Sequence, residues 1–238
     1  MKALLRLFWL ALAAALLLQL FFVARIAAMA VLDPGSTSFE RTEAWRLAQD
    51  ARDLKWSQQW QPYERISPAL KRAVIASEDA GFMGHGGVQW QAIEKAYARN
   101  QTAEEKAEKA DDGRPVKIYG GSTITQQLAK NLLLSGERSL LRKGQELVLA
   151  QLLELLLGKR RILELYLNHV EWGEGVFGAE AAARHYFRKS AADLSNAEAA
   201  RLAVMLPAPK RFEKMPQSRY LMQRSRTIMR YLPMVAIP

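Results

Sequence analysis

The order of apolar and polar residues divides the chain into one long apolar segment and a later series of amphipathic segments. Residues 7–24 (LFWLALAAALLLQLFFVA) contain no charge. A helix of this length spans about 27 Å, close to the thickness of the hydrocarbon core of a bilayer. From residue 67 onward, apolar residues recur at helical spacing, and no segment alternates as a half-buried strand does. The pattern predicts a membrane-spanning helix followed by an all-α domain.

Local signals predict where the helices of this domain begin and end. Ser67 is a candidate N-cap, with Pro68 at the first helical position. Gly158 ends the helix before it, and Ser195 forms a capping box with Glu198. The segment LVLAQLLELLL is apolar nearly all round, which is typical of a buried central helix. We expect helices at about residues 67–75, 89–99, 123–134, 140–157, 159–169, 195–207 and 218–232, and one that contains residues 181–183.

A polar stretch, Asn100–Lys117, interrupts the helical pattern. It is rich in Glu, Lys, Ala and Asp and has almost no apolar residue. Because such a segment cannot bury an apolar face, we interpret it as a mobile surface loop.

Charges beside the apolar segment predict its orientation. Lys2 and Arg6 precede it and Arg25 follows it, so the short N-terminus is expected in the cytoplasm. A signal peptide cleaved after Ala30 is the alternative, because residues 28–30 (AMA) resemble a cleavage site. The long leucine-rich run favours the uncleaved anchor, and both interpretations export the rest of the chain. The expected parts are a cytoplasmic N-terminus (1–6), the anchor and its flank (7–32) and an exported domain (33–238).

The composition points to an acidic partner. The chain has 34 Lys and Arg residues against 24 Asp and Glu residues, a net charge of +10. Such an excess favours nucleic acid, an anionic membrane surface or a phosphorylated substrate as the partner, and export argues against nucleic acid. There are no cysteines, which excludes disulfides, thiolate metal sites and a cysteine nucleophile.

Three polar segments stand where helices begin or end. Residues 78–87 (EDAGFMGHGG) place two adjacent carboxylates at the end of an apolar helix. In residues 120–131 (GGSTITQQLAKN), glycines precede Ser and Thr at a helix start, where free backbone N–H groups can bind an anion. Residues 142–146 (RKGQE) combine two cations with a glutamate that leads into the apolar helix. Each also has a plain structural interpretation: a solvated helix end, a capped amphipathic helix and a surface ion pair.

Together the three segments suit the transfer of a sugar from a pyrophosphate. A sugar hydroxyl is a poor acid and needs a general base such as a glutamate. A pyrophosphate leaving group is a weak base that needs positive charge more than a proton. No nucleotide-binding glycine fingerprint follows a strand pattern. The donor therefore need not be a nucleotide sugar, and a lipid-linked donor would explain the anchor.

These motifs, in this order, carry a family resemblance. The matching stretches are residues 78–87, 121–131, 142–146 with an extension to Glu154, 159–168, 173–189 and, more weakly, 224–229. They resemble the signatures of the peptidoglycan glycosyltransferases, which are shared with the N-terminal domain of class A penicillin-binding proteins. Because no transpeptidase segment follows, the chain resembles the monofunctional members. Gln89 is a departure, since the family usually has an acidic residue there, and Asp would cap the next helix better than Gln.

The resemblance implies a lysozyme-like helical fold with a membrane-associated lobe. One helix would anchor it in the cell inner membrane, with the catalytic domain in the periplasm. The implied reaction polymerises lipid II into β-1,4-linked glycan strands, with inversion and release of undecaprenyl pyrophosphate. The implied partners are lipid II as donor, the growing glycan as acceptor, the inner membrane and other proteins of cell-wall synthesis and division. Neither nucleic acid nor a nucleotide, haem or flavin cofactor is implied.

The resemblance also implies roles for individual residues. Glu78 would take the proton from the 4-hydroxyl of the acceptor GlcNAc. Glu146 would help the donor pyrophosphate, directly or through a divalent cation, Mg²⁺ or Mn²⁺, for which it is the candidate ligand. The polar stretch Asn100–Lys117 matches a mobile flap of the family. The residues expected to hold the donor phosphates or line the cleft are Ser122, Thr123, Gln127, Lys130, Asn131, Arg142 and Lys143.

Two other functions compete with this interpretation. A lysozyme-like hydrolase or lytic transglycosylase cleaves the same polymer with one glutamate, but it needs no phosphate-binding cations. A non-catalytic scaffold that binds anionic lipid would leave the pairing of Glu78 with Glu146 unexplained. We expect His169 and His185 to be core or surface residues, because no second metal-type partner stands at a suitable spacing.

Overall fold

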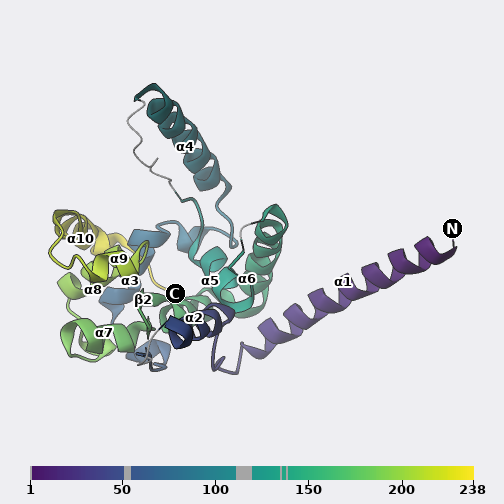
Figure 1. Ribbon diagram of the computed structural model, residues 1–238. Helices are drawn as coiled ribbons and strands as arrows, with labels where there is room; N and C mark the ends of the chain where they lie inside the picture. Colours follow the sequence, from purple (N-terminus) through teal and green to yellow (C-terminus); the bar gives the residue numbers. More distant parts are fainter. Residues whose placement is uncertain (1, 51–54, 111–119, 135, 138) are drawn as a thin grey trace.

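The computed structural model describes residues 2–50, 55–110, 120–134, 136–137 and 139–238. These residues form mainly helices, which confirms the predicted all-α fold class (Figure 1). The α-helices are α1 (Lys2–Ala28), α2 (Ser38–Asp50), α3 (Pro68–Glu78), α4 (Trp90–Ala110), α5 (Ile124–Leu133), α6 (Leu140–His169), α7 (Ala179–Phe187), α8 (Asn196–Met205), α9 (Pro209–Glu213) and α10 (Arg219–Tyr231). The strands are β1 (Ser57–Gln58), β2 (Glu171–Gly173) and β3 (Val176–Phe177), and the 3₁₀ helices are η1 (Tyr63–Arg65), η2 (Phe82–Gly84), η3 (Ala191–Asp193) and η4 (Leu232–Met234).

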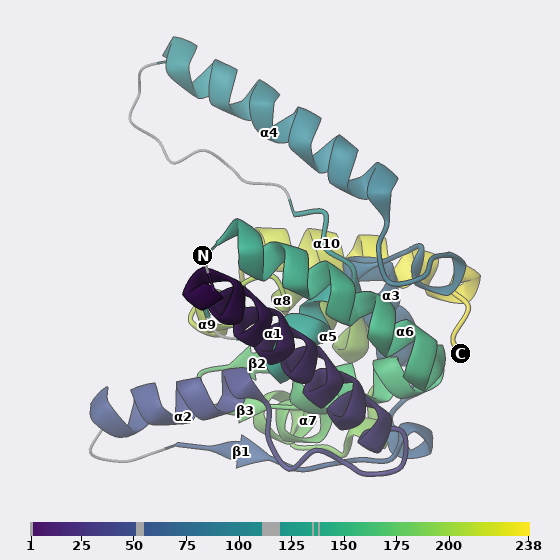
Figure 2. The ribbon, with the colours of Figure 1, turned by 90° about the vertical axis from the view of Figure 1, so that its right-hand side faces the viewer.

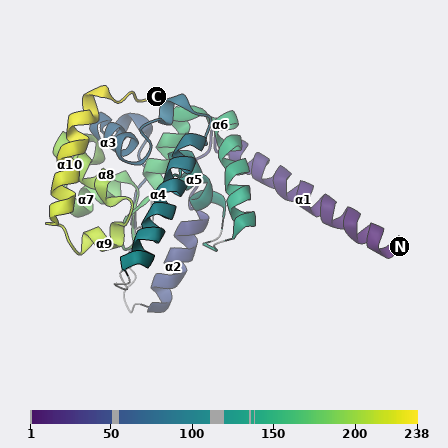
Figure 3. The same ribbon diagram turned by 90° about the horizontal axis from the view of Figure 1, so that it is seen from above.

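Helix α1 contains the predicted apolar span and extends it at both ends. It is long and apolar enough to cross a membrane. Most of its side chains are exposed, and the buried ones, Phe22 and Ile26, lie near its C-terminal end. Figures 1 and 3 show α1 projecting from one side of the molecule, while α10 lies on the opposite side. The projecting apolar surface is what a membrane anchor requires.

The core of the domain lies between two groups of helices. Helix α5 packs along α6, and both α3 and α10 pack on α8. Leu128 and Leu132 of α5 are fully buried together with Leu149 and Leu153 of α6. Removal of such side chains from water stabilises the fold by about 25 cal/mol per Å² of apolar surface.

The prediction that the middle of α6 is buried all round is wrong for one face. Leu149 and Leu153 are buried, but Val148 is 47 % exposed and Leu155 is 79 % exposed. The prediction counted apolar residues, which a membrane-facing surface requires as much as a protein core does. The exposed face fits the membrane-associated lobe that the family resemblance implies.

The predicted helix ends are confirmed where side chains cap them. The Ser67 hydroxyl accepts a hydrogen bond from the N–H of Ala69, 3.2 Å away. Ser195 and Glu198 form the expected capping box at the start of α8. At Gly158 the backbone leaves the helical conformation, with φ +70° and ψ 164°. The two helices predicted on either side of Gly158 are therefore joined end to end as α6. The backbone breaks at Gly158, as the sequence predicted.

The interpretation of Asn100–Lys117 as a loop is wrong for residues 100–110. Helix α4 continues through this polar stretch to Ala110, and residues 111–117 lie outside the described residues. Ala, Glu and Lys are strong helix formers, so the stretch can be helical without burying an apolar face. Figures 1 and 2 show α4 projecting from the body of the domain.

A small sheet adds to the helices, although the sequence showed no strand pattern. The strand order is β1-β3-β2, with β1 parallel and β2 antiparallel to β3. Each strand has two or three residues, which is too short for alternation to be visible. The sheet joins the segment after α2 to the end of α6.

Candidate active site

The predicted catalytic base, Glu78, is the last residue of α3 and contacts α5. The side-chain amide of Gln127 donates a hydrogen bond to Oε2 of Glu78, with a distance of 3.0 Å. The amide oxygen of Gln127 accepts one from the Tyr166 hydroxyl, also at 3.0 Å. Because Tyr166 can donate to this oxygen, the amide has a defined orientation with its N–H toward Glu78.

The surroundings of Glu78 raise the pKa of its carboxyl. Burial is the largest cause, and the neighbouring charge of Asp79 acts in the same direction. The hydrogen bond from Gln127 and the charge of Arg224 partly oppose the rise. A carboxylate with a raised pKa is a stronger base than one in water, which suits proton abstraction from a hydroxyl.

Asp79, the second carboxylate, has structural contacts instead. Its oxygens lie 3.0 Å from Nε2 of His85, and one accepts a hydrogen bond from the N–H of Ile124 at 3.1 Å. The N–H of Gly87 donates to Nδ1 of His85 at 3.1 Å, so Nε2 is the nitrogen that donates to Asp79. Asp79 thus joins the loop after α3 to the first residue of α5.

Thr123 completes this junction. Its buried hydroxyl donates to the carbonyl oxygen of Gly87 at 2.6 Å and accepts from the N–H of Gln126 at 3.1 Å. Gly87 has φ +88°, and a Cβ there would lie 2.9 Å from the carbonyl oxygen of Ala150. The loop therefore packs directly against α6. Thr123 stabilises this packing through its bond to Gly87, and its hydroxyl is already hydrogen-bonded within the protein.

Two of the three predicted phosphate-binding cations, Arg142 and Lys143, contact Glu146 near the start of α6. Nη1 of Arg142 lies 3.2 Å from one oxygen of this buried carboxylate. Nζ of Lys143 forms an ion pair with the other oxygen and donates to the hydroxyl of Ser122 at 3.3 Å. The cations of α6 are thus connected to the loop that leads into α5.

Helix α5 lies between the two groups of contacts. Its first turns follow Ser122, and Gln127 on the same helix holds Glu78. Lys130 follows Gln127 by three residues and is exposed, and Asn131 is half-buried. Residues three or four apart lie on one face of a helix. The structure therefore brings Glu78 together with Gln127, and Ser122 with the cations of α6, at one end of α5.

Four residues near the predicted site, Thr125, Glu154, Lys159 and Tyr166, had no role predicted from the sequence but make contacts there. Nζ of Lys159 donates to Glu154 at 2.6 Å and to the carbonyl oxygen of His85 at 2.7 Å. Glu154 also accepts from the hydroxyl of Thr125 at 2.6 Å. Tyr166 orients Gln127, as described. These residues fall in or next to matched motifs, which was the available signal.

The donors around Glu146 do not fit a divalent cation in this arrangement. Both oxygens of Glu146 contact cationic nitrogens, whereas Mg²⁺ and Mn²⁺ prefer several oxygen ligands. Within the described residues there is no group of three or more His, Cys, Asp and Glu side chains that could hold a metal ion. The divalent cation therefore stays a prediction from the family resemblance.

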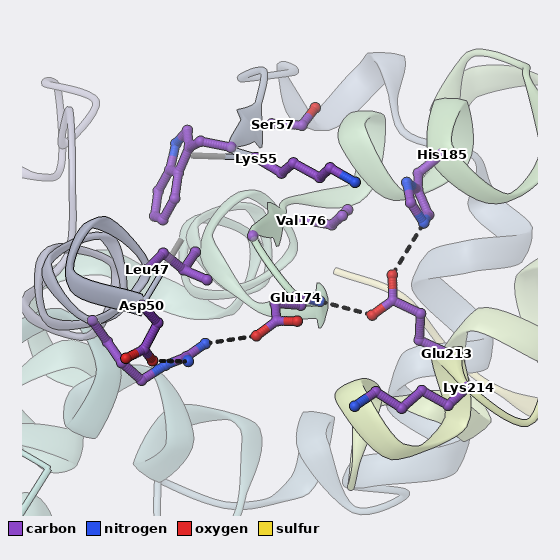
Figure 4. A pocket seen from close by; sticks show the side chains of 12 residues that line it. Leu47, Asp50, Lys55, Ser57, Glu174, Val176, His185, Glu213 and Lys214 are labelled. Carbon is purple, nitrogen blue, oxygen red and sulfur yellow. Dashed lines mark hydrogen bonds and ion pairs between the residues drawn. The ribbon is translucent and has the colours of Figure 1, made fainter. Parts of the chain in front are cut away.

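A cavity of about 810 Å³ lies elsewhere, beside α2, the sheet and α9 (Figure 4). Several of its charged groups form ion pairs with one another: Arg46 lies 2.9 Å from Glu174, and His185 lies 3.2 Å from Glu213. None of the predicted site residues lines it. His185 is thus a surface residue and His169 a buried one, 2.8 Å from Glu40, as predicted.

The sequence is similar to known proteins along almost its whole length. A family model described as transglycosylase matches residues 47–232. A biosynthetic peptidoglycan transglycosylase of Bordetella pertussis is 53% identical over 224 residues, which cover 94% of this chain and 90% of that protein. A protein of the same name from Paraburkholderia xenovorans is 51% identical over 220 residues, 92% of this chain and 87% of that protein. One from Herminiimonas arsenicoxydans is 49% identical over 235 residues, 98% of this chain and 97% of that protein.

Proposed function

The chain belongs to the transglycosylase family, and from that premise we propose how its residues extend a peptidoglycan glycan strand. It is a peptidoglycan glycosyltransferase of cell-wall biosynthesis, and the hydrolase alternative is not favoured. In the proposed reaction the 4-hydroxyl oxygen of an acceptor GlcNAc attacks C1 of a donor sugar linked to polyprenyl pyrophosphate. The bond between C1 and the pyrophosphate oxygen breaks with inversion, and the hydroxyl proton passes to a base.

Glu78 is the base in this proposal. Gln127 holds its Oε2, so we assign the other oxygen, Oε1, to the acceptor hydroxyl. Burial raises the pKa of Glu78, which increases its affinity for the proton that the hydroxyl loses. The contact between Glu78 and Gln127 is the observation that carries the proposal, because it directs the carboxylate of α3 toward the face of α5 that also bears Lys130.

The cations of α6 stabilise the leaving group in this proposal. Arg142 and Lys143 carry two positive charges beside one carboxylate, Glu146, and Lys130 adds a third positive charge from α5. A pyrophosphate that leaves C1 gains negative charge, which cationic hydrogen-bond donors stabilise best. We assign Glu146 the role of holding Arg142 and Lys143 in place, and Ser122 that of positioning Lys143.

Substitution of Glu78 tests the proposal. Purified Glu78→Gln enzyme is expected to fold but to lose at least 100-fold in the rate of glycan formation from lipid II, because an amide cannot accept the proton. A gel assay of glycan length measures this loss. Glu64→Gln is the matched control, since Glu64 is exposed and pairs with Arg160; its rate should equal that of the wild type. Full activity of Glu78→Gln would remove Glu78 from the mechanism.

The same preparation separates a synthase from a hydrolase. We expect polymer from lipid II and no soluble fragments from finished peptidoglycan. Fragments released by the wild type and not by Glu78→Gln would instead favour the hydrolase.

We also propose that α1 anchors the enzyme in the inner membrane, with residues 1–6 in the cytoplasm and the catalytic domain in the periplasm. The length and apolar character of α1 and the cations before it support this orientation. The lipid carrier of the donor would then share the bilayer with α1. Other cell-wall synthesis and division proteins remain expected partners on this proposal.

A further inference from the structure

One polar side chain interrupts the apolar span of α1. Gln19 is the only amide or charged side chain among residues 7–24. Its amide pairs with that of Gln145 in α6, because each Nε2 donates to the other's oxygen at 3.1 Å. An amide in the hydrocarbon region needs such a partner, since no water is there to bond with it.

The face of α1 that bears Gln19 is also its contact face. Phe22 and Ile26, three and seven residues further on, are buried, while Leu18 and Leu20 on either side of Gln19 are exposed. Helix α1 packs on α6 along this face (Figure 2). At its C-terminal end, the carbonyl oxygen of Met29 accepts a hydrogen bond from the guanidinium of Arg161 in α6 at 2.8 Å. The end of α1 is thus connected to α6 independently of the amide pair.

The pair also places the start of α6 along the apolar span. Gln19 lies five residues before the end of this span at Ala24, or about 8 Å along the helix. The first turns of α6 therefore lie beside the C-terminal half of the span, where lipid contact is expected if α1 is the anchor. Leu140 and Leu141, which are 92 % and 89 % exposed, are suited to that environment.

Gln145 stands within the group of residues assigned to the donor pyrophosphate. It directly precedes Glu146 and follows Arg142 by three residues and Lys143 by two. Because a helix is rigid over one turn, fixing Gln145 against α1 also fixes the direction in which these side chains point. The anchor and the phosphate-binding cations are therefore connected by two hydrogen bonds.

We propose that Gln19 and Gln145 are positioning residues, which hold the first turns of α6 at the depth and rotation that present Arg142 and Lys143 to the pyrophosphate of the lipid-linked donor. This inference rests on the proposed function, which supplies the role of those cations. On this proposal α1 is part of the donor site as well as an anchor.

Disulfide trapping tests the contact without any assay of activity. The chain has no cysteine, so Gln19→Cys/Gln145→Cys introduces a single pair. In proteoliposomes of the full-length enzyme, an oxidant should cross-link this pair and shift its mobility on a non-reducing gel. The matched control is Leu20→Cys/Gln145→Cys, because Leu20 is 63 % exposed beside Gln19; it should cross-link at least ten times more slowly. Equal rates for the two pairs would overturn the proposed contact.

Kinetics in the same proteoliposomes test the positioning role. Gln19→Leu and Gln145→Leu should each raise the apparent KM for lipid II about three- to tenfold, the size expected for one or two amide hydrogen bonds in a bilayer, with kcat changed less than twofold. The double variant should resemble the single ones, because the two residues act as one pair. Oxidised Gln19→Cys/Gln145→Cys should return to nearly the wild-type KM, and reduction should raise its KM again.

Two control variants distinguish a failure of the positioning inference from a failure of the proposed donor site. Leu20→Ala should leave KM and kcat unchanged. Arg142→Ala should raise KM, and an unchanged KM there would contradict the proposed role of Arg142 at the donor. A raised KM for Arg142→Ala with unchanged values for both Gln19→Leu and Gln145→Leu would instead overturn the positioning inference alone.

Discussion

Glu78 and Asp79 are neighbours in the sequence but differ in their contacts. Asp79 is bound to His85 and to the N–H of Ile124, whereas Glu78 accepts a hydrogen bond from the side chain of Gln127. The residue pattern places both carboxylates at a helix end, and the family resemblance selected Glu78 as the base. The partners of Asp79 and Thr123 lie 45 and 36 residues away, so the structural contacts of Asp79 could not be predicted from its neighbours in the sequence.

The raised pKa of the half-buried Glu78 carboxyl has an effect on stability that can be measured. Because burial raises its pKa, the folded state binds a proton more tightly than the unfolded state does. The stability linked to this group is fully present below its unfolded pKa and is lost as the pH rises through its raised folded pKa. Glu78→Gln removes this loss, so its Tm should exceed that of the wild type at pH 7.5.

The difference in Tm should shrink as the pH falls and disappear below the ordinary pKa of a glutamate, where the wild-type carboxyl is protonated in both states. Thermal melts at several pH values measure it, with Glu64→Gln as the exposed control. A Tm of Glu78→Gln below that of the wild type at pH 7.5 would contradict the prediction that the charged carboxylate destabilises the folded state.

At the scale of helices, the sequence predicted helix ends most accurately where a capping side chain or a glycine defines them. Ser67 and Gly158 were identified in this way. Helix α2 was missed although Thr37 and Glu40 exchange capping hydrogen bonds at its start, at 2.7 and 3.0 Å, and this Thr-x-x-Glu spacing was visible in the sequence. The polar half of α4 was predicted as a loop because it has no apolar face to bury, although its residues have high helix propensity. The strands were too short to leave a pattern.

The break in α6 provides a test within one helix. Gly158 has φ +70° and open space around its missing Cβ, so Gly158→Ala strains only the backbone. We expect a destabilisation of about 1–3 kcal/mol, or a decrease in Tm of several degrees. Gly144→Ala is the control, because this glycine is helical and also has open space; it should be neutral or stabilising by about 0.5–1 kcal/mol. Equal melting temperatures for the two variants would show that the break carries no strain for alanine.

At the scale of the whole molecule, the exposed apolar surface is distributed unevenly. Exposed large apolar side chains occur along α1, at Leu140 and Leu141 at the start of α6, and at Leu155 further along α6. The sequence predicted the apolar span from its length. It could not show that α6 also exposes an apolar face, because the same run of apolar residues is expected in a helix that contacts lipid and in a helix buried in a core.

Cysteine labelling tests which parts lie in the membrane. In proteoliposomes with the catalytic domain outside, a water-soluble maleimide should react with Leu141→Cys at least tenfold more slowly than with Met222→Cys. Met222 is exposed on α10, on the side of the molecule opposite α1. Solubilisation of the vesicles in detergent should reduce the difference between the reaction rates of Leu141→Cys and Met222→Cys. Similar rates for the two in intact vesicles would place the start of α6 in water.

The junction made by Asp79, Thr123 and Gly87 has one more consequence. Glu78, the proposed base, is adjacent in sequence to Asp79, which bonds to the first residue of α5, and α5 in turn supplies the amide that holds Glu78. Loss of these contacts should therefore displace the proposed base and the start of α5 together. Heat should dismantle the chemistry and the architecture in one cooperative event.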